Sequence, residues 1–306
     1  MAPRTKRTRG RPLSGLLLID KPRGMTSFAV VSRIRRILGV RRVGHTGTLD
    51  PMATGLLPIC LGQATKLARF VTDADKGYRA RVLLGVATDT LDADGRVTGV
   101  DDPERIRAID ETAFRGALDQ FRGEITQTPP AYSAIKVDGE RLYAKARRGE
   151  TVEAPPRQVV IHALTLVEAA PPEFAVDVRC SKGTYIRTLA ADVGARLGVG
   201  AHLVDLRRTA VGPHDVTDAV ALETLVADPE RIVAEHLLPL VEVAGQLPMV
   251  TVGPELAQDF RHGRRRPLPD GGCGPARLVD EAGTLIAIVH PRGQAPAEII
   301  RGFAAE

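Results

Sequence analysis

Strand and helix patterns follow one another in an irregular order along this 306-residue chain. Apolar runs typical of buried strands occur at residues 16–20 and 56–61, and period-two alternation predicts a strand at 78–84. Helical spacing and capping residues predict helices at 27–38, with Phe28 on the apolar face, and at 184–197. Because strands and helices do not alternate strictly, the order favours an α+β fold over a doubly wound parallel sheet.

Composition divides the chain into three parts. Residues 1–12 form a basic tail that we expect to be disordered, and residues 13–245 form the main domain. Two Pro-Pro pairs within residues 123–156 predict an insertion that leaves the main sheet and returns to it. Two further strands are predicted after it, at 159–167 and 174–180. Short apolar runs between Gly and Pro turns predict a small β-rich domain at 246–306.

The net charge of +5 comes from the tail, because the first eleven residues hold five basic and no acidic side chains. Without those five, 37 basic side chains balance 37 acidic ones, so a polyanion site must come from local patches. Three acid-poor basic clusters lie at residues 33–42, 141–148 and 261–266. Their number favours a surface for nucleic-acid phosphates over solvated helix faces. The acidic stretch 89–119 is expected to lie away from that surface.

Several functional classes are disfavoured by the composition. The three cysteines, Cys60, Cys180 and Cys273, are far apart and show no metal-binding spacing, so we expect reduced thiols and a cytoplasmic protein. No apolar run approaches the ~18 residues that a membrane span needs, and no membrane association is expected. The absence of Trp and an aromatic content of 4% disfavour extended stacking platforms for single-stranded nucleic acid.

The densest polar cluster is the loop GHTGTLDP at residues 44–51. Its two glycines permit backbone conformations that other residues resist, and Pro51 biases Asp50 toward an extended conformation. Asp50 can therefore present its carboxylate to a ligand, although a single loop Asp more often caps a turn. The basic cluster just before the loop favours chemistry, because a carboxylate repels phosphate. Taken alone, His45 of the same loop has an ordinary packing role.

A second cluster, CSKGTYIR at residues 180–187, ends one predicted strand and opens the next helix. Tyr185 and Arg187 can flank a site at the first turn, where a guanidinium would keep a nearby carboxylate ionised and oriented. The alternative is a surface arginine. Ser133 and Lys136 match the S-x-x-K pattern of acyl-serine enzymes, but no S-D-N follows and so short a pattern arises by chance.

Five segments, in matching order, resemble the TruB family of tRNA pseudouridine synthases. They are GLLLIDKPRGMTSF (15–28), GHTGTLDPMATGLLPICLG (44–62), TPPAYSAIKVDGERLYAKARRG (128–149), CSKGTYIRTLAADVGARLG (180–198) and AHLVDLRRTAVG (201–212). The resemblance implies an isomerase that converts uridine 55 in the T-loop of tRNA to pseudouridine after flipping the base out of its stack. It also explains the S-x-x-K pattern as part of the family's insertion.

The resemblance further implies the α+β pseudouridine synthase fold, with a mixed, mostly antiparallel central sheet and a small C-terminal PUA-like RNA-binding domain. Its partner would be the T-arm stem-loop of tRNA. The reaction would need neither cofactor nor metal, because it oxidises nothing and transfers no group. The compact insertion favours a stand-alone enzyme, and we expect a monomer.

Seven residues receive roles from the resemblance. Asp50 would be the nucleophile; Tyr78 would stack on the target ring and take part in proton removal; Arg187 would pair with Asp50; His45 would fill the space of the flipped base; Tyr185 and Leu206 would line the uridine pocket; and Lys21 would support it.

Other interpretations remain open at this point. A non-catalytic RNA-binding or RNA-folding module would keep the basic clusters without needing Asp50, and an acyl-serine hydrolase would use Ser133. The sequence does not choose between attack at the sugar, attack at the ring and elimination to a glycal. The base that removes the final proton is equally open, with Asp50 and a water bound to Tyr78 as candidates.

Overall fold

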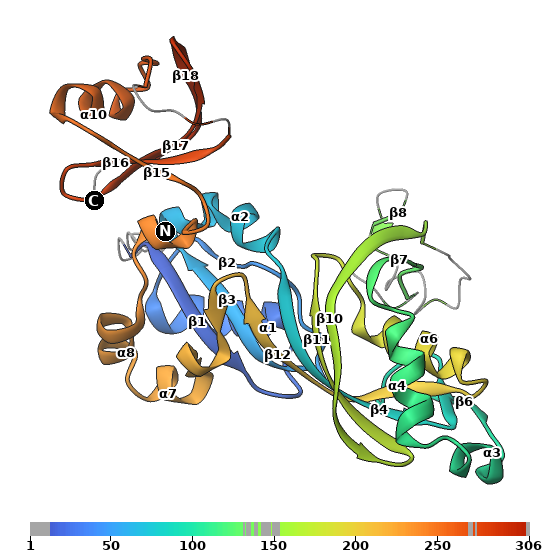
Figure 1. Cartoon of the computed structure of the whole chain (residues 1–306). Helices are drawn as coiled ribbons and strands as arrows, with labels where there is room; N and C mark the ends of the chain where they lie inside the picture. The colour runs from blue at the N-terminus through green and yellow to red at the C-terminus, as the bar shows by residue number, and fades with distance from the viewer. Residues whose placement is uncertain are drawn as a thin grey trace. The chain divides into compact units, whose positions relative to one another are not determined.

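The computed structural model describes residues 13–130, 132, 136–137, 140–141, 148, 154–268, 272 and 274–303. The chain forms two compact units (Figure 1). Unit 1 comprises Met1–Asp50, Leu56–Asp73 and Gly212–Glu306, and unit 2 comprises Pro51–Gly55 and Ala74–Val211. Both units combine sheets with helices, so the predicted α+β class is confirmed.

Unit 1 is built from short strands and helices that come from both ends of the chain. Its elements before the last sheet are β1 (Gly15–Lys21), α1 (Ser27–Leu38), β2 (Val43–His45), most of β3 (Thr54–Leu61), the 3-10 helix η1 (Gly62–Lys66), α2 (Ala68–Thr72), β13 (His214–Asp215), η2 (Val216–Asp218), β14 (Val220–Ala221), α7 (Leu222–Ala227), α8 (Pro229–His236) and α9 (Leu240–Val243). The predicted strands at 16–20 and 56–61 are thereby confirmed, and β2 takes the first residues of the predicted loop.

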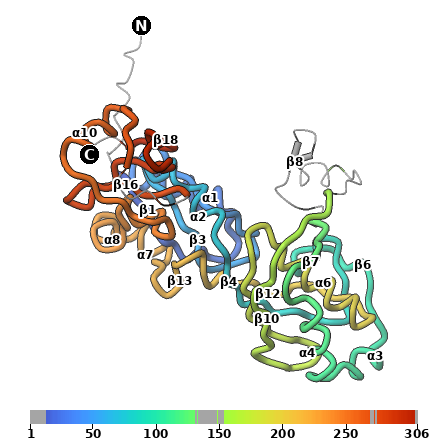
Figure 2. Tube along the Cα trace, turned by 45° about the horizontal axis from the view of Figure 1, so that its top comes forward, coloured from blue at the N-terminus to red at the C-terminus, as the bar shows by residue number. Residues whose placement is uncertain are grey.

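The core of unit 1 forms around β1, whose residues Leu16 to Ile19 are all buried. β14 pairs with β1 in parallel, and helices α7 and α8 from the far end of the chain pack against it. Figure 2 shows this return, with the orange helices beside the blue strand. Hydrogen bonds of 2.9 Å in both directions join the backbones of Leu16 and Leu238.

Helix α1 follows its capping residues. The Thr26 side chain accepts a hydrogen bond from the backbone N–H of Ala29, and Gly39 ends the helix at φ 65° in the left-handed region, as its position predicts. Phe28 was expected on the apolar face, and that prediction is wrong: 67% of its surface is exposed. The buried stripe contains Val31, Ile34 and Leu38, as the spacing predicted, together with Ser27 and Val30.

The C-terminal part of unit 1 contains a sheet in the order β15-β16-β17-β18. Its elements are β15 (Met249–Val252), α10 (Pro254–Arg261), β16 (Ala276–Asp280), β17 (Leu285–Arg292) and β18 (Ala295–Gly302). The small β-rich region is therefore present, with one helix that the short apolar runs did not indicate. Phe260 of α10 is buried against Leu278 and Ala287 of the sheet, which gives this region its own core.

Unit 2 is built on one sheet with β4 in the middle. Its elements are β4 (Lys76–Leu84), β5 (Val86–Thr88), β6 (Val97–Val100), α3 (Pro103–Arg107), α4 (Glu111–Asp119), β7 (Gly123–Gln127), β8 (Lys136–Val137), β9 (Glu140–Arg141), β10 (Arg157–Ala170), β11 (Glu173–Cys180), α6 (Ile186–Arg196) and β12 (Ala201–Val211). Strands β12, β4, β11, β10 and β7 are neighbours in that order and pair antiparallel.

The sheet of unit 2 is mixed, because the start of β3 joins it in parallel. Thr54 and Gly55 of β3 lie opposite Arg207 and Arg208 of β12. Helices α4 and α6 cover one face of the sheet, where the Phe114 and Phe174 rings stack 4.0 Å apart. The opposite face carries exposed ion pairs such as Arg79 with Asp177 at 2.8 Å. A mixed, mostly antiparallel sheet is therefore confirmed.

The predicted insertion leaves the sheet and returns to it as expected. Gln127 at the end of β7 pairs with Arg157 at the start of β10, so the chain departs after residue 127 and re-enters at 157. Much of the segment between them, including Ser133 and Lys145, lies outside the described residues. The structure therefore does not test the interpretation of Ser133 as the nucleophile of an acyl-serine enzyme.

Candidate functional site

The loop that carries Asp50 is fixed from helix α1. The Ser27 hydroxyl donates to the Leu49 carbonyl at 3.1 Å and accepts from the Leu49 N–H at 2.8 Å. Ser27 and Leu49 are both buried, whereas Asp50 is half-buried. One side chain thus satisfies both backbone groups of the residue before Asp50. The carboxylate stands at the end of a fixed segment, where the chain passes from unit 1 into unit 2.

Two other predicted residues of unit 1 stabilise their own loops. Lys21 is fully buried, and its ammonium group donates to the carbonyls of Pro22 at 2.9 Å and Met25 at 2.7 Å. It thereby holds the turn before α1. His45 accepts through Nδ1 from the Gly47 N–H at 3.3 Å, which places its ring beside the glycine turn.

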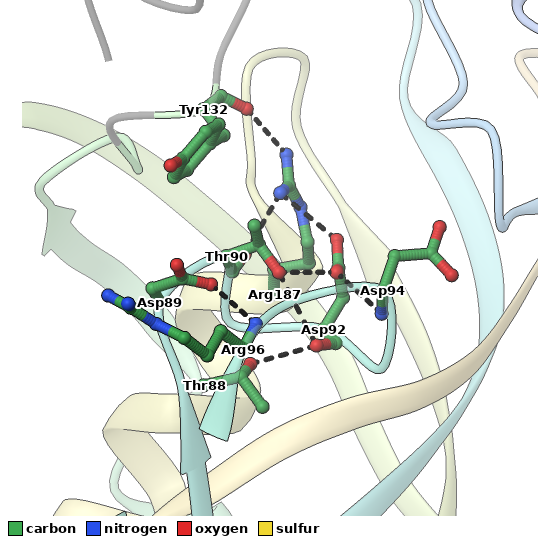
Figure 3. Close-up of polar contacts among 8 residues, drawn as sticks. All are labelled: Thr88, Asp89, Thr90, Asp92, Asp94, Arg96, Tyr132 and Arg187. Carbon is green, nitrogen blue, oxygen red and sulfur yellow. Dashed lines mark hydrogen bonds and ion pairs between the residues drawn. The ribbon is translucent and has the colours of Figure 1, made fainter. Parts of the chain in front are cut away.

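Arg187 lies in α6 and forms a buried ion pair with Asp92. Its guanidinium is 3.1 Å from an Asp92 carboxylate oxygen, and the two side chains are 5% and 6% exposed. It also donates to the carbonyls of Thr90 and Tyr132, each at 2.9 Å. Figure 3 shows the guanidinium between the Asp92 loop and Tyr132. Arg187 is therefore not the surface arginine of the alternative reading.

The partner Asp92 belongs to the acidic stretch 89–119, which was expected to lie away from the phosphate-binding surface. That prediction concerned the stretch as a whole and did not single out Asp92, whose carboxylate is buried against Arg187. Thr90 donates to its carboxylate at 2.6 Å, and the backbone N–H of Asp94 donates at 3.2 Å (Figure 3). The dense Thr, Asp and Gly pattern TDTLDADG was the available signal, since such residues form tight turns.

The Asp92 turn also contains a strained residue. Leu91 has φ 63°, in the left-handed region that a leucine rarely adopts. Such a conformation costs about 1–2 kcal/mol and persists where surrounding contacts determine it. Here the Leu91 carbonyl accepts from the Leu203 N–H at 3.1 Å, and the Ala93 N–H donates to the Leu203 carbonyl at 2.9 Å. Strand β12 thus holds the loop that positions Asp92.

Tyr185 is the N-cap of α6, so the helix begins at Ile186 and not at 184 as the spacing predicted. The buried Gln127 amide explains the difference. It accepts from the Tyr185 N–H at 3.0 Å and donates to the Tyr185 carbonyl at 3.2 Å, which keeps Tyr185 extended. The Arg157 guanidinium lies 4.6 Å from the centroid of the Tyr185 ring. The sequence did not indicate Gln127. By holding the backbone of Tyr185, Gln127 fixes the chain two residues before Arg187.

Tyr78 and Leu206 lie on the two central strands of unit 2. Tyr78 of β4 is opposite Arg208 of β12, and Leu206 is opposite Ala80, so the alternation of side chains places Tyr78 and Leu206 on one face. This is the face that α6 covers. Unit 2 therefore gathers Tyr78, Tyr185, Arg187 and Leu206, whereas Lys21, His45 and Asp50 belong to unit 1. The implied pairing of Arg187 with Asp50 joins the two units and stays a prediction.

The buried cysteines do not supply a nucleophile. Burial raises the pKa of the Cys60 thiol to about 12 and that of Cys180 to about 11, so both are protonated at neutral pH. Cys273 lies outside the described residues. Within the described part of the chain, no three His, Cys, Asp or Glu side chains gather as they would around a metal ion. No helix there is long and apolar enough to cross a membrane.

The basic clusters differ in the exposure and the ion pairing of their arginines. The arginines of the 33–42 cluster are all exposed. In the 261–266 cluster, Arg264 and Arg266 both pair with Asp259, at 3.2 and 2.8 Å. The first cluster is thus the stronger candidate for phosphate contacts. In the 141–148 cluster, Lys145 and Arg147 lie outside the described residues, whereas Arg148 is exposed.

Comparison with known protein families gives a consistent result. The family described as "TruB family pseudouridylate synthase (N terminal domain)" matches residues 35–186, and "tRNA pseudouridylate synthase B C-terminal domain" matches residues 187–243. The tRNA pseudouridine synthase B of Azoarcus sp. is 47% identical over 88% of each chain. That of Cupriavidus metallidurans is 45% identical over 94% of each chain.

Solved structures share the fold. A chain of an H/ACA RNP bound to a substrate RNA containing 2′-deoxyuridine superposes with a TM-score of 0.73 at 22% identity, covering 95% of this chain and 85% of the other. A chain of a Cbf5-Nop10-Gar1 complex gives a TM-score of 0.71 at 25% identity, covering 95% of this chain and 84% of the other. These likenesses agree with the expected fold.

Proposed function

The chain belongs to the TruB family of pseudouridylate synthases, and we propose that it converts uridine 55 in the T-loop of tRNA to pseudouridine with Asp50 as nucleophile. Curated relatives at 45–47% identity carry the name tRNA pseudouridine synthase B. The observation that carries the proposal for this chain is the Asp50 loop. Its sequence matches the family's catalytic segment, and Ser27 fixes both backbone groups of Leu49 just before the carboxylate.

The reaction exchanges an N–C glycosidic bond for a C–C bond to the same base. A carboxylate that attacks the ribose or the ring can hold an intermediate while the base turns, and elimination to a glycal remains a third route. No group leaves the RNA and nothing is oxidised, so the proposal includes no cofactor and no metal. The final step removes a proton from carbon, which requires a base within reach.

The other predicted residues support this chemistry in stated ways. Arg187, held by Asp92 and by the carbonyls of Thr90 and Tyr132, is a fixed cation that would keep the nucleophile ionised. Tyr185 and Leu206 would line the uridine pocket, with Tyr78 on the target ring. His45 would occupy the space of the flipped base, and Lys21 would act indirectly through the turn that it stabilises.

Recognition of the RNA would depend on charge and shape. The exposed arginines of the 33–42 cluster lie just before the Asp50 loop in sequence and are suited to phosphate contacts. Such contacts can offset the cost of unstacking the target base, which is about a few kcal/mol. The C-terminal sheet from β15 to β18 would act as a PUA-like RNA-binding domain. We further propose that the enzyme acts as a monomer in the cytoplasm.

The experiment that tests this function uses an unmodified T-arm stem-loop with tritium at uridine C5. The wild-type protein should release tritium, and Asp50→Asn should release none while still binding the RNA. Asp119→Asn is the matched control, because Asp119 is an exposed residue of α4 that pairs with Arg122 at 2.9 Å. It should behave as wild type. If wild type binds the stem-loop and releases no tritium, the RNA-binding module becomes the better interpretation, or another uridine is the target.

A further inference from the structure

Arg208 of β12 is a charged side chain in the interior of unit 2 that neither the motifs nor the resemblance assigned to a role. Only 1% of its surface is exposed, and it is the largest of the fully buried side chains in the described ranges. Burying a guanidinium is costly unless hydrogen bonds compensate for the lost water. A buried arginine next to a predicted site residue therefore needs a physical explanation.

The register of the sheet places Arg208 directly beside Tyr78. The two residues are partners across the antiparallel β12–β4 pair, and Val178 of β11 flanks Tyr78 on the other side. A hydrogen bond joins the two side chains, with the guanidinium donating to the phenol oxygen. Because side chains alternate along a strand, Leu206 shares this face, whereas Arg207 faces the opposite way.

The charge of Arg208 affects the Tyr78 hydroxyl. Burial lowers the pKa of Arg208, and the interaction with Tyr78 acts in the opposite sense by favouring the charged guanidinium. An arginine nevertheless keeps its charge in proteins. A buried cation that donates to a phenol oxygen stabilises negative charge on that oxygen, and the low local polarity strengthens the effect.

The backbone around Arg208 leaves it little freedom. Gly55 of β3 lies opposite Arg208 in the parallel pair, and its φ is 98°. A Cβ atom at Gly55 would lie 2.3 Å from the Arg208 carbonyl oxygen, so only glycine leaves room for the backbone of β12 at this point. Arg208 is thus fixed between β3 and β4, as a residue that orients a reacting group must be.

We propose that Arg208 is a positioning residue that holds the Tyr78 hydroxyl as the base for removal of the uridine C5 proton. The proposal rests on the proposed function. Once C5 is bonded to C1′ of the ribose, the Tyr78 phenolate takes the C5 proton. The electron pair of the C5–H bond closes the C5=C6 double bond, the C6=N1 double bond of the intermediate opens onto N1, and N1 takes up a proton from solvent. The phenol returns its proton to solvent before the next turnover.

The test compares two T-arm RNAs under single-turnover conditions with enzyme in excess. One carries uridine at the target position and the other carries 5-fluorouridine, which has fluorine where uridine has the C5 hydrogen. The fluorinated base can be detached and rejoined through carbon, but it has no C5 proton to lose. Nuclease digestion and chromatography of the nucleosides follow both conversions. Each variant is compared with wild type on the same RNA.

The expected result is a selective loss. Arg208→Lys should slow conversion of the uridine RNA by about 10²-fold, within the range for one general base, and leave conversion of the fluorinated RNA nearly unchanged. Tyr78→Phe should show the same pattern, and the double variant should be no slower than Tyr78→Phe, because the arginine acts through the phenol oxygen. Arg79→Gln, an exposed arginine beside Tyr78 on the opposite face, should match wild type.

An equal loss with both RNAs, or no loss with either, overturns the proposal. If Arg208→Lys does not fold, Tyr78→Phe alone decides, since it removes the oxygen that Arg208 holds and keeps the ring. An equal loss by Tyr78→Phe on both RNAs then excludes the phenol as the proton acceptor. Failure of wild type to convert either RNA would instead contradict the proposed function, which is a separate outcome.

Discussion

Arg187 and Asp92 form an ion pair at 3.1 Å with both side chains almost completely buried. They are 95 residues apart in sequence, and each is held independently. Arg187 donates to two backbone carbonyls, and Asp92 accepts from Thr90 and from the Asp94 N–H. The pair therefore fixes the start of α6 to the Asp92 loop, which makes the position of Arg187 depend on a residue outside the family motifs identified from the sequence.

Replacing Asp92 with Asn should lower the free energy of unfolding and impair catalysis. Removing one member of a buried ion pair typically costs about 3–5 kcal/mol, because the other charge stays buried without compensation. We expect a loss of about 3 kcal/mol for Asp92→Asn, since the amide keeps the shape of the carboxylate. Urea unfolding measures the stability, and C5-tritium release measures the activity of the folded fraction.

Asp94→Asn is the matched control for this change. Asp94 is exposed and takes part in the turn through its backbone N–H, which the substitution retains. It should leave both stability and activity near wild type. Equal unfolding curves for Asp92→Asn and wild type would contradict the buried-pair interpretation.

Local signals in the sequence predicted most elements of the fold. Thr26 and Gly39 bounded α1 correctly because capping depends on residues next to the helix. The start of α6 was misplaced by two residues because Gln127, 58 residues away in sequence, holds Tyr185 extended. The position of Phe28 was also wrong, although Val31, Ile34 and Leu38 are buried as predicted, since helical spacing alone does not say how wide a stripe the neighbouring elements cover.

Some residues of the candidate site were also predictable from local sequence, and others were not. Asp50 and Arg187 were identified because each lies in a dense local motif. Asp92 and Arg208 were not, because their importance comes from pairing across strands and loops that only the folded chain brings together. Treating residues 89–119 as one acidic stretch concealed Asp92 among the other acids there.

Gly55→Ala should destabilise the protein through its effect on β12. The new Cβ would lie 2.3 Å from the Arg208 carbonyl oxygen and 2.7 Å from its nitrogen, and alanine disfavours the φ of 98°. Backbone atoms cannot move aside cheaply, so we expect a loss of about 2 kcal/mol or more. Gly116→Ala in α4 is the matched control, because no described atom lies within 4 Å of its added methyl group. That variant should gain about 0.5–1 kcal/mol in urea unfolding.

Cys60 and Cys180 should be unreactive in the folded protein. Both are fully buried, and burial raises their thiol pKa values to about 12 and about 11. In a Cys273→Ser background, a disulfide reagent such as DTNB should therefore label neither thiol until urea unfolds the chain. Rapid labelling under native conditions would mean that β3 or β11 opens locally far below the global unfolding free energy.

Asp192 of α6 should reduce stability at neutral pH. Burial raises the pKa of its carboxyl above the ordinary value of 3.8, so the folded state keeps the proton at a pH where the unfolded chain has lost it. The free energy of unfolding therefore falls as pH rises from the unfolded value through the folded one. Asp192→Asn removes this penalty and should be at least as stable as wild type at pH 7. The difference should shrink as the pH falls below the folded-state pKa of Asp192, because wild type then also carries the neutral group.

Asp215 is the control for Asp192, because its carboxyl pKa is shifted in the opposite direction. Hydrogen bonds from the backbone N–H and hydroxyl of Thr217 lower the pKa of its exposed carboxyl, so the charged form stabilises the folded state. This contribution is present above the unfolded pKa and is lost as pH falls through the folded one. Asp215→Asn should therefore be less stable than wild type at pH 7. Urea unfolding of both variants from pH 7 to below pH 3.8 measures the two trends, because the Asp215 contribution is lost only below that ordinary value. A shift of the same sign for both variants would contradict the opposite environments of the two carboxyls.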